Sequence, residues 1–336
     1  MKPPCFRSIS NVSLFLLVLL SLSSADAVQV TRVIVGVDGY ARAERWVPVV
    51  FDLHNEGQRF RGKIQVRKGQ TVFEKSLDLG ESSKKRIELL YYHTNAYESL
   101  RYLILDPEGA TLREGNLEPR MLNYRDNLLL VISTHEYDHQ FLNGQENPWG
   151  GKTYVAYYKP RELFSEWMGF SSADGIALGS LSPGQMLPAQ WKAIGQHVAS
   201  GGVLIFSAIT DFAVLQDPIY KNHLPRISPA FNQISHADFL VSTWVKNTTD
   251  PFPQVEIPAQ FVVKRDCDRE LISLPAGSSL VTSSPYYKGS IIYFAFDYTR
   301  IPEELRKLFA RIWNTTVYPS TPSGDVGLSS RFRQKL

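Results

Sequence analysis

Three residues near the middle of the chain have the spacing of a zinc-protease motif. His135, Glu136 and His139 stand in the order His-Glu-x-x-His within LLLVISTHEYDHQFLNG, residues 128–144. In metalloproteases two histidines four residues apart bind the ion, and the glutamate between them acts on the attacking water. This chemistry needs a helix, because the helical period turns residues four apart toward one ion.

The surrounding sequence does not favour a helix at this motif. Residues 127–133 read NLLLVIS, a short apolar run typical of a buried strand, and Asn143-Gly144 downstream is a turn former. We therefore expect a polar loop after a strand, without bound zinc. On that basis His139→Ala and Glu136→Gln would change stability by no more than about 0.5 kcal/mol, the range usual for surface substitutions.

The first 27 residues have the features of a secretory signal peptide. Lys2 and Arg7 precede an apolar run, and Ala25-Asp26-Ala27 is a small-x-small cleavage site. We expect a mature chain that starts at Val28 and is exported, periplasmic or secreted. No later segment approaches the about 20 apolar residues needed to cross a membrane, so no transmembrane segment is expected in the mature chain.

Charge and cysteine content narrow the class of protein further. The 336 residues carry a net charge of +3, which becomes +2 once the signal peptide takes away two cations and one anion. So weak a charge gives no electrostatic reason to expect a nucleic-acid partner. Cleavage leaves Cys267 as the single cysteine, which excludes an internal disulfide and fits a bacterial envelope.

Two kinds of hydrophobic pattern divide the mature chain. Residues 28–122 alternate apolar and polar side chains between turn formers, as Val47, Val49, Phe51 and Leu53 illustrate, which predicts an antiparallel β-sandwich. Pro48 within this strand suggests an edge or a bulge. Residues 123–317 combine short apolar strands with amphipathic helices, and residues 318–336 have the composition of a disordered tail.

The second region predicts a parallel sheet with additional antiparallel strands. Expected parallel strands are 128–132, 153–157, 175–178 and 203–207; expected antiparallel strands are 260–263, 271–274, 280–282 and 290–296; expected helices are 188–200 and 302–313. The order strand, helix, strand across residues 175–207 is the reason for expecting parallel pairing, since such a crossover joins parallel strands.

A resemblance to a known group accompanies these patterns. The runs RWVPVVFDLHNEGQRFRGKIQV (45–66), DGIALGSLSPGQMLPAQWKAIGQHVASGGVLIFSA (174–208) and YYKGSIIYFAFDYTRIP (286–302) resemble uncharacterised exported bacterial proteins. Those proteins pair an immunoglobulin-like domain with a class I glutamine amidotransferase-like (flavodoxin-like) domain, and the likeness covers nearly all of residues 28–317. It implies a multidomain β plus α/β fold, an immunoglobulin-like sandwich followed by a degenerate amidotransferase-like domain.

The residues that could do chemistry do not assemble into a recognisable site. Amidotransferases use a cysteine on a sharp turn with a histidine and a glutamate, whereas Ser207 stands where that nucleophile is expected, without flanking glycines. Cys267 lies among acidic residues, which makes it a poor nucleophile, and the one His-x-Glu, His54-Asn55-Glu56, falls at a turn of the β region. We assign no catalytic, cofactor-binding or metal-binding residue and no cofactor.

Tyrosine pairs could instead supply a binding surface. Alternation along strands should bury one tyrosine of each pair and expose the other in Tyr91-Tyr92, Tyr157-Tyr158 and Tyr286-Tyr287. The leading hypothesis is a non-catalytic binding or scaffolding protein of the bacterial cell envelope with an unknown envelope protein as partner. The alternatives are an envelope hydrolase, using metal at His135, Glu136 and His139 or a serine, and a sugar- or peptide-binding module.

Overall fold

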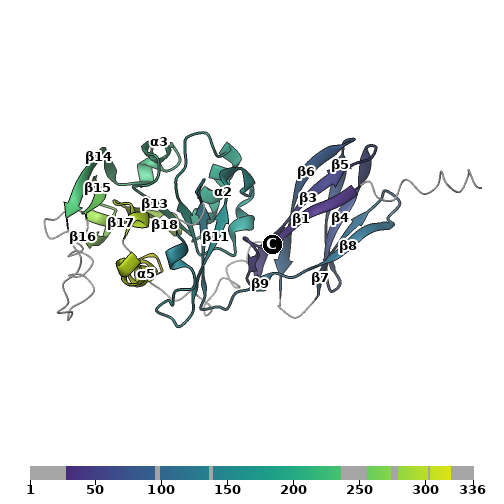
Figure 1. Cartoon of the computed structure of the whole chain (residues 1–336), viewed down its shortest axis with the longest axis horizontal. Coiled ribbons are helices and arrows are strands. Elements are labelled where there is room, and N and C mark those ends of the chain that lie inside the picture. Colours follow the sequence, from purple (N-terminus) through teal and green to yellow (C-terminus); the bar gives the residue numbers. More distant parts are fainter. Residues whose placement is uncertain are drawn as a thin grey trace, which may run out of the picture. The chain divides into compact units, whose positions relative to one another are not determined.

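The computed structural model describes residues 28–94, 99–135, 139–235, 256–273, 279–301 and 303–318 (Figure 1). The chain forms two compact units. Unit 1 contains residues up to 34, 49–91 and 97–118, and unit 2 contains residues 35–48, 92–96 and 119 onward. Three segments of the predicted sandwich region, 35–48, 92–96 and 119–122, therefore belong to unit 2. The expected signal peptide lies outside the described residues, as does the expected tail after Tyr318.

The described part of unit 1 consists of strands and turns. One three-stranded sheet has the order β1 (Val28–Val35), β3 (Arg45–Asn55) and β6 (Ser83–His93), and a four-stranded antiparallel sheet has the order β5 (Thr71–Leu79), β4 (Phe60–Lys68), β7 (Leu100–Leu105) and β8 (Thr111–Leu117). Ring contacts join the two sheets, with Phe51 and Tyr102 at 5.4 Å and Phe73 and Tyr91 at 6.3 Å between centroids. The strand-rich reading of this region is confirmed.

The central strand β3 shows why the alternating pattern predicts this region well. Val47, Val49, Phe51 and Leu53 are buried, as expected for one face of a strand that packs on a core. Of the two expectations for Pro48, an edge strand or a bulge, the edge is wrong, because β3 is the middle strand of its sheet. The proline is tolerated near the end of β1, where its carbonyl accepts a hydrogen bond from Gly36 N at 2.7 Å.

Unit 2 is built on a seven-stranded mixed sheet. Its order is β11 (Thr153–Tyr158), β10 (Asn127–Ile132), β12 (Gly175–Leu178), β13 (Val203–Ser207), β18 (Gly289–Phe294), β17 (Ser279–Tyr286) and β16 (Arg269–Ser273). The first five strands are parallel and the last two pairings are antiparallel. The four expected parallel strands are thus confirmed, as is antiparallel pairing for the expected strands at 260–263, 271–274 and 280–282. The expectation for 290–296 needs correction, because β18 pairs in parallel with β13 and only its other side is antiparallel, to β17.

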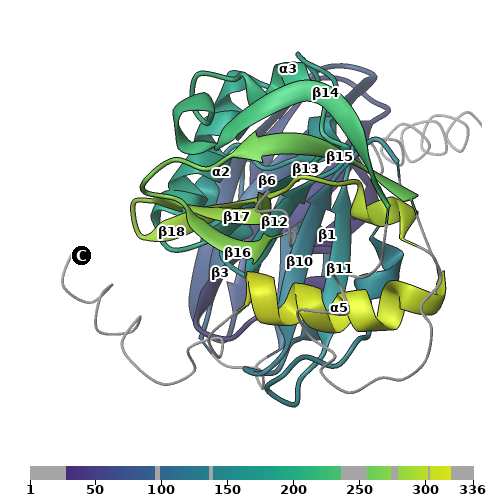
Figure 2. The same cartoon turned by 90° about the vertical axis from the view of Figure 1, so that its left-hand side faces the viewer.

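Two helices cover opposite faces of this sheet. Helix α5 (Glu303–Val317) packs Phe309 and Trp313 on the face that carries Leu129, Val131, Ile205 and Phe294, and Figure 2 shows it crossing the sheet. Helix α2 (Pro188–Ala199) lies on the other face. There Phe206 contacts Tyr220, whose ring in turn contacts Trp191 of α2. Alternate residues of each strand therefore enter two separate cores.

The end of α5 corrects the expected start of the tail. Tyr318, expected as the first residue of the disordered tail, is buried, and its amide donates to Asn314 O at 3.1 Å.

The remaining elements are β2 (Tyr40–Ala41), β9 (Arg120–Met121), η1 (Gln140–Leu142), η2 (Pro160–Glu162), η3 (Trp167–Phe170), α3 (Phe212–Leu215), η4 (Lys221–His223), β14 (Arg226–Ser235), β15 (Glu256–Val263) and η5 (Tyr298–Arg300).

The free edge of β11 is protected by side chains from loops. The outward amides of Val155 and Tyr157 donate to Asn143 Oδ1 at 3.1 Å and Asp38 Oδ2 at 3.3 Å. The amide of Thr153 donates to the carbonyl of Gln145 at 2.9 Å. Exposed edge strands invite pairing with other chains, and these bonds occupy the donors that such pairing would use.

The turn between β15 and β16 is held by one buried carboxylate. Asp268 accepts hydrogen bonds from the Arg265 guanidinium and amide and from Ser284 Oγ at 2.7 Å, and its side chain is fully buried. Burial alone would raise the pKa of Asp268, but these donors outweigh it and the pKa is lowered. The carboxylate therefore remains charged and ties the turn to β17.

We expect Asp268→Asn to destabilise unit 2 by about 2 to 4 kcal/mol, because the Arg265 guanidinium loses its charged acceptor. Asp266→Asn is the matched control, since Asp266 lies in the same turn outside this buried network and should change stability by no more than about 0.5 kcal/mol. Urea unfolding of both variants measures the difference. Equal effects of the two substitutions would show that the buried carboxylate does not hold the turn.

Candidate functional site

The carboxyl edge of the parallel sheet is the first place to look for a site. Strand β10 pairs with β11 on one side and β12 on the other, so the direction of chain progression reverses there. In open α/β sheets, ligands bind at the carboxyl ends of the strands beside such a reversal. The residues at this point are Ser133 and Thr134 after β10 and Gly179 and Ser180 after β12.

These two strand ends are bonded closely to each other. Thr134 donates to the carbonyl of Ser180 from its amide at 3.2 Å and from its hydroxyl at 2.9 Å. A Cβ on Gly179 would lie 2.7 Å from the Cβ of Ser133, so only glycine permits this approach. The polar groups here therefore serve mainly to join the loops after β10 and β12.

The two histidines of the His-Glu-x-x-His sequence lie in different environments. His135 is exposed beyond β10, whereas His139 is fully buried and immediately precedes η1; Glu136 falls outside the described residues. The described part of the motif does not lie on an α-helix, which agrees with the expectation of a loop after a strand. Among the residues described, no group of three or more His, Cys, Asp and Glu side chains is placed to hold a metal ion.

The burial of His139 corrects the view of this motif as surface loop. Its Nε2 is joined by a 2.7 Å hydrogen bond to the hydroxyl of Tyr298, and its ring contacts those of Tyr298 and Trp313 edge-on at 5.2 and 6.4 Å. Desolvation lowers the pKa of His139 to about 3. The side chain is thus a neutral part of the core, and His139→Ala cannot be a neutral surface change as expected from the sequence.

Ser207 is also enclosed by the core. It is the last residue of β13, its side chain is fully buried, and its hydroxyl has no hydrogen-bond partner among the residues described. A serine nucleophile needs access to substrate and a base within hydrogen-bond reach. The surroundings of Ser207 provide neither in this conformation.

The other reactive candidates belong to other segments of the chain. Cys267 is exposed, with its thiol 3.7 Å from the Asp268 carboxylate that holds the β15–β16 turn. His54 and Glu56 lie at the end of β3 in unit 1, with 3.5 Å between Nδ1 and Oε1. Neither arrangement brings a nucleophile, a base and an orienting group together.

The tyrosine pairs follow the expected alternation in two of three cases. Tyr91 and Tyr286 are buried, whereas Tyr92 is 39% and Tyr287 84% exposed. Tyr158 is buried while Tyr157 is only partly covered. Tyr287 also has a φ of +53° in the two-residue turn between β17 and β18, a conformation that costs free energy for a bulky side chain.

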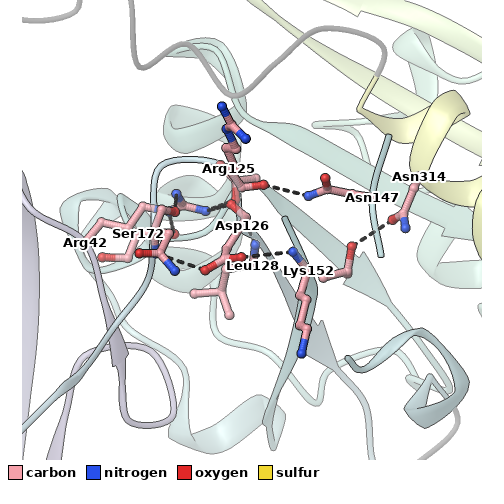
Figure 3. A network of polar contacts seen from close by, with 11 residues as sticks. Arg42, Arg125, Asp126, Leu128, Asn147, Lys152, Ser172 and Asn314 are labelled. Carbon is pink, nitrogen blue, oxygen red and sulfur yellow. Dashed lines mark hydrogen bonds and ion pairs between the residues drawn. The ribbon is translucent and has the colours of Figure 1, made fainter. Parts of the chain in front are cut away.

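A charged network ties together the amino edge of the same sheet. The guanidinium of Arg42 donates to the carbonyls of Ser172, Asn123 and Asp126 and forms a 2.5 Å ion pair with Asp174, as Figure 3 shows for several of these contacts. Asp174 also accepts from the amide of Leu128 at 2.7 Å. One arginine therefore connects the residues that precede β10 and β12.

Further polar side chains extend this network to β11 and α5. Asp126 accepts from the amides of Asn123 and Lys152, both at 2.9 Å. Thr153 at the start of β11 donates to Asn314 of α5 at 2.8 Å (Figure 3). These contacts satisfy backbone and side-chain groups where four elements meet, so the network has a structural role.

Little in the sequence predicts the contacts of Arg42. Arg42 lies in YARAER between strands of the β region, about 130 residues before its partners Ser172 and Asp174. Neither local spacing nor hydrophobic period marks such a contact. The turn formers Asn147-Pro148-Trp149-Gly150-Gly151 were a usable signal, since Asn147 accepts from the amides of Trp149 and Gly151.

Comparison with known proteins gives limited similarity. Residues 29–120 match the model of a family described as "Domain of unknown function (DUF8726)". No curated protein matches the chain. Among the described residues, no helix combines the length and apolar character required to span a bilayer.

Several solved structures resemble parts of the chain. The exo-β-1,4-mannosidase Op5Man5 from Opitutaceae bacterium strain TAV5 is 14% identical over 56% of this chain and 35% of its own, with a TM-score of 0.36. A protein from Thermoplasma acidophilum described as a "putative gmp synthase subunit a protein" is 12% identical over 62% of this chain and 98% of its own, with a TM-score of 0.32. The chain spans about a third of the mannosidase, and similarity this weak carries no conclusion about fold or activity.

We expect Arg42→Met to destabilise unit 2 by about 2 to 3 kcal/mol, because Asp174 and three carbonyls lose their charged donor in a largely buried position. Arg125→Met is the matched control, since the Arg125 side chain is exposed and its polar and ring contacts within the described residues are to the neighbouring Tyr124. Chemical denaturation compares the two. A loss for Arg125→Met as large as that for Arg42→Met would contradict the role of the network.

The buried histidines predict acid sensitivity. Burial holds the pKa of His139 at about 3 and that of His197 at about 4, below the ordinary 6.5. The unfolded chain therefore takes up these protons as the pH falls below 6.5 and the folded chain does not, so stability declines from pH 6.5 downward. Each histidine should remove about 2 kcal/mol between pH 7 and pH 5.

Urea unfolding between pH 7 and pH 5 measures this decline. His139→Gln should be less stable at pH 7 but lose less stability on acidification than the wild type, since it removes one titrating group. His135→Gln makes the same replacement at an exposed neighbouring histidine and serves as the control for the loss of core packing at pH 7. An unchanged slope in His139→Gln would mean that His139 is not a neutral core residue.

Proposed function

We propose that this chain is a non-catalytic binding or scaffolding protein, exported to the bacterial cell envelope and acting through an envelope protein partner. The export part of the proposal rests on the signal-like sequence of residues 1–27. We further propose that unit 1 is an immunoglobulin-like sandwich. Unit 2 would then be a degenerate glutamine amidotransferase-like domain of flavodoxin-like fold.

One observation carries the non-catalytic part. At the carboxyl edge of the parallel sheet, His139 and Ser207 have no exposed surface and are packed into the cores on the sheet. His139 in addition has a pKa of about 3, which makes it a very weak base at neutral pH. The side chains that could react are thus engaged in stabilising the fold.

The strand order supports the finer assignment of unit 2. Along the chain the five parallel strands β10, β11, β12, β13 and β18 are first to fifth, and their spatial order is second, first, third, fourth, fifth. This is the doubly wound order of flavodoxin-like folds. Helices α2 and α5 on opposite faces fit the same architecture.

A second candidate function is that of a sugar- or peptide-binding module. It is favoured by Tyr287, which is 84% exposed and held at a φ of +53° at the tip of a hairpin. The tip is tied down, because the amides of Lys288 and Ser290 donate to the carbonyls of Ala199, the last residue of α2, and of Gly202 just after it. A rigidly presented aromatic ring can stack on a sugar or fill a peptide-binding contact.

Capture from a bacterial envelope extract, combined with turnover assays, tests the leading proposal. The purified mature chain should retain a defined envelope protein and show no hydrolysis of peptide, amide or glycoside reporters. Ser207→Ala and His135→Ala should retain the same protein in the same amount, because neither side chain performs chemistry. The chain unfolded by heat serves as the control for non-specific retention.

Two results would favour other functions. Hydrolysis that disappears in Ser207→Ala, or one zinc per chain that is lost in His135→Ala, would make the hydrolase the leading interpretation. A rise in melting temperature with soluble peptidoglycan fragments, lost in Tyr287→Ala, would favour the sugar- or peptide-binding module.

A further inference from the structure

Two arginines lie directly opposite each other on neighbouring strands of unit 1. Arg67 of β4 is paired in register with Arg101 of β7 in the four-stranded sheet. Opposed residues of an antiparallel pair have Cβ atoms about 5 Å apart, and like charges there are destabilising. Repulsion within the pair therefore destabilises the folded chain, and an anion bound between the two guanidinium groups would remove this repulsion.

Both arginines project from the outer face of the sheet. Ile64 and Val66 alternate with Arg67 on β4 and are fully buried, so Arg67 points away from the core. Arg101 is exposed on β7, and Leu100 and Ile104, which project from the opposite face of that strand, are buried. A ligand can thus reach the pair from solvent.

The row across the sheet contains no carboxylate. Arg67 is opposite Val72 of β5, and Arg101 is opposite Asn116 of β8, so the four positions are valine, arginine, arginine and asparagine. Within the described part of the chain, the side chain of Arg101 forms no hydrogen bond or ion pair. The two cations face each other without a counter-ion from this row.

Other cations on the same face of β4 are neutralised. Arg59, just before the strand, pairs with Asp78 at 2.6 Å, and Arg61 lies 3.7 Å from the same carboxylate. Lys63 pairs with Glu74 at 3.0 Å. Among these cations of β4, Arg67 is therefore the exception, since its side chain forms no ion pair with a carboxylate in the described part of the chain.

Arg67 is also held in a fixed orientation. Gln65, which is only 8% exposed, accepts hydrogen bonds at its Oε1 from Nε and Nη2 of Arg67, at 2.9 and 2.8 Å. Its amide nitrogen donates to Glu74 at 2.9 Å, which fixes the amide itself. Such a preformed guanidinium loses little freedom when it binds an oxyanion.

We propose that Arg67 and Arg101 form a binding site for a phosphate group, with Asn116 as a neutral neighbour. Guanidinium groups match the oxygens of phosphate in geometry and charge. The phosphate could be free or belong to a lipid headgroup, and the site goes beyond the binding or scaffolding function proposed above. It concerns unit 1, so its failure would not affect the test of that function.

Melting of the mature chain in inorganic phosphate, against sodium chloride of equal ionic strength, tests the site. Phosphate should raise the melting temperature of the wild type, with an apparent Kd weakened about tenfold or more in Arg101→Gln. Without phosphate, Arg101→Gln should melt at or above the wild-type temperature, because the repulsion is relieved. Arg59→Gln removes the same charge from a neutralised position and should keep the wild-type response.

Sedimentation with vesicles identifies the source of the phosphate. Binding to vesicles of phosphatidylcholine and phosphatidylglycerol, absent for phosphatidylcholine alone and lost in Arg101→Gln, supports the site with a headgroup as ligand. A response to inorganic phosphate without vesicle binding supports a soluble ligand. The site would be refuted by equal phosphate responses in Arg101→Gln and Arg59→Gln, or by a wild type that responds to neither probe.

Discussion

The contacts of the Arg42 guanidinium are the constraint on which the architecture of unit 2 depends. The strands β10, β12 and β11 begin within a few residues of its network, and parallel strands need their starting points aligned before their ladders can form. An arginine satisfies three carbonyls and one carboxylate at once because its donors point in fixed directions. A lysine has one point charge and could not replace that geometry.

At the opposite, carboxyl edge of the sheet, polar side chains are likewise bonded or packed within the protein. The architecture places the ends of β10, β12 and β13 where other proteins of similar topology bind ligands. Here Thr134 bonds to Ser180, His139 bonds to Tyr298, and Ser207 lies in the core. Each of these side chains packs or bonds within the protein at this edge. Burial in the aromatic cluster around Trp313 keeps His139 in its neutral form.

The sequence predicts the elements better than it predicts the contacts between them. The strand at 175–178 and that at 203–207 were expected within their observed bounds, since short apolar runs between turn formers leave few alternatives. The burial of His139 was missed, because a polar-looking loop gives no sign that a tyrosine 159 residues later encloses it. The contacts of Arg42 are not predicted for the same reason, because polar contacts between distant residues produce no periodic pattern in a sequence.

Charge is used in two opposite ways in this protein. In unit 2, Arg42 and Arg265 are each paired with a carboxylate, and their contacts hold the chain in place. In unit 1, Arg67 is oriented by a buried glutamine and faces another arginine instead of an acid. Hydrogen bonds to the buried Gln65 amide hold the Arg67 side chain in place beside a repulsive partner. A neutral residue at this position would stabilise the sheet equally well. The arrangement is suited to bind a negatively charged group from outside the chain. Such a group would replace the repulsion between the two arginines by favourable charge-assisted hydrogen bonds to both.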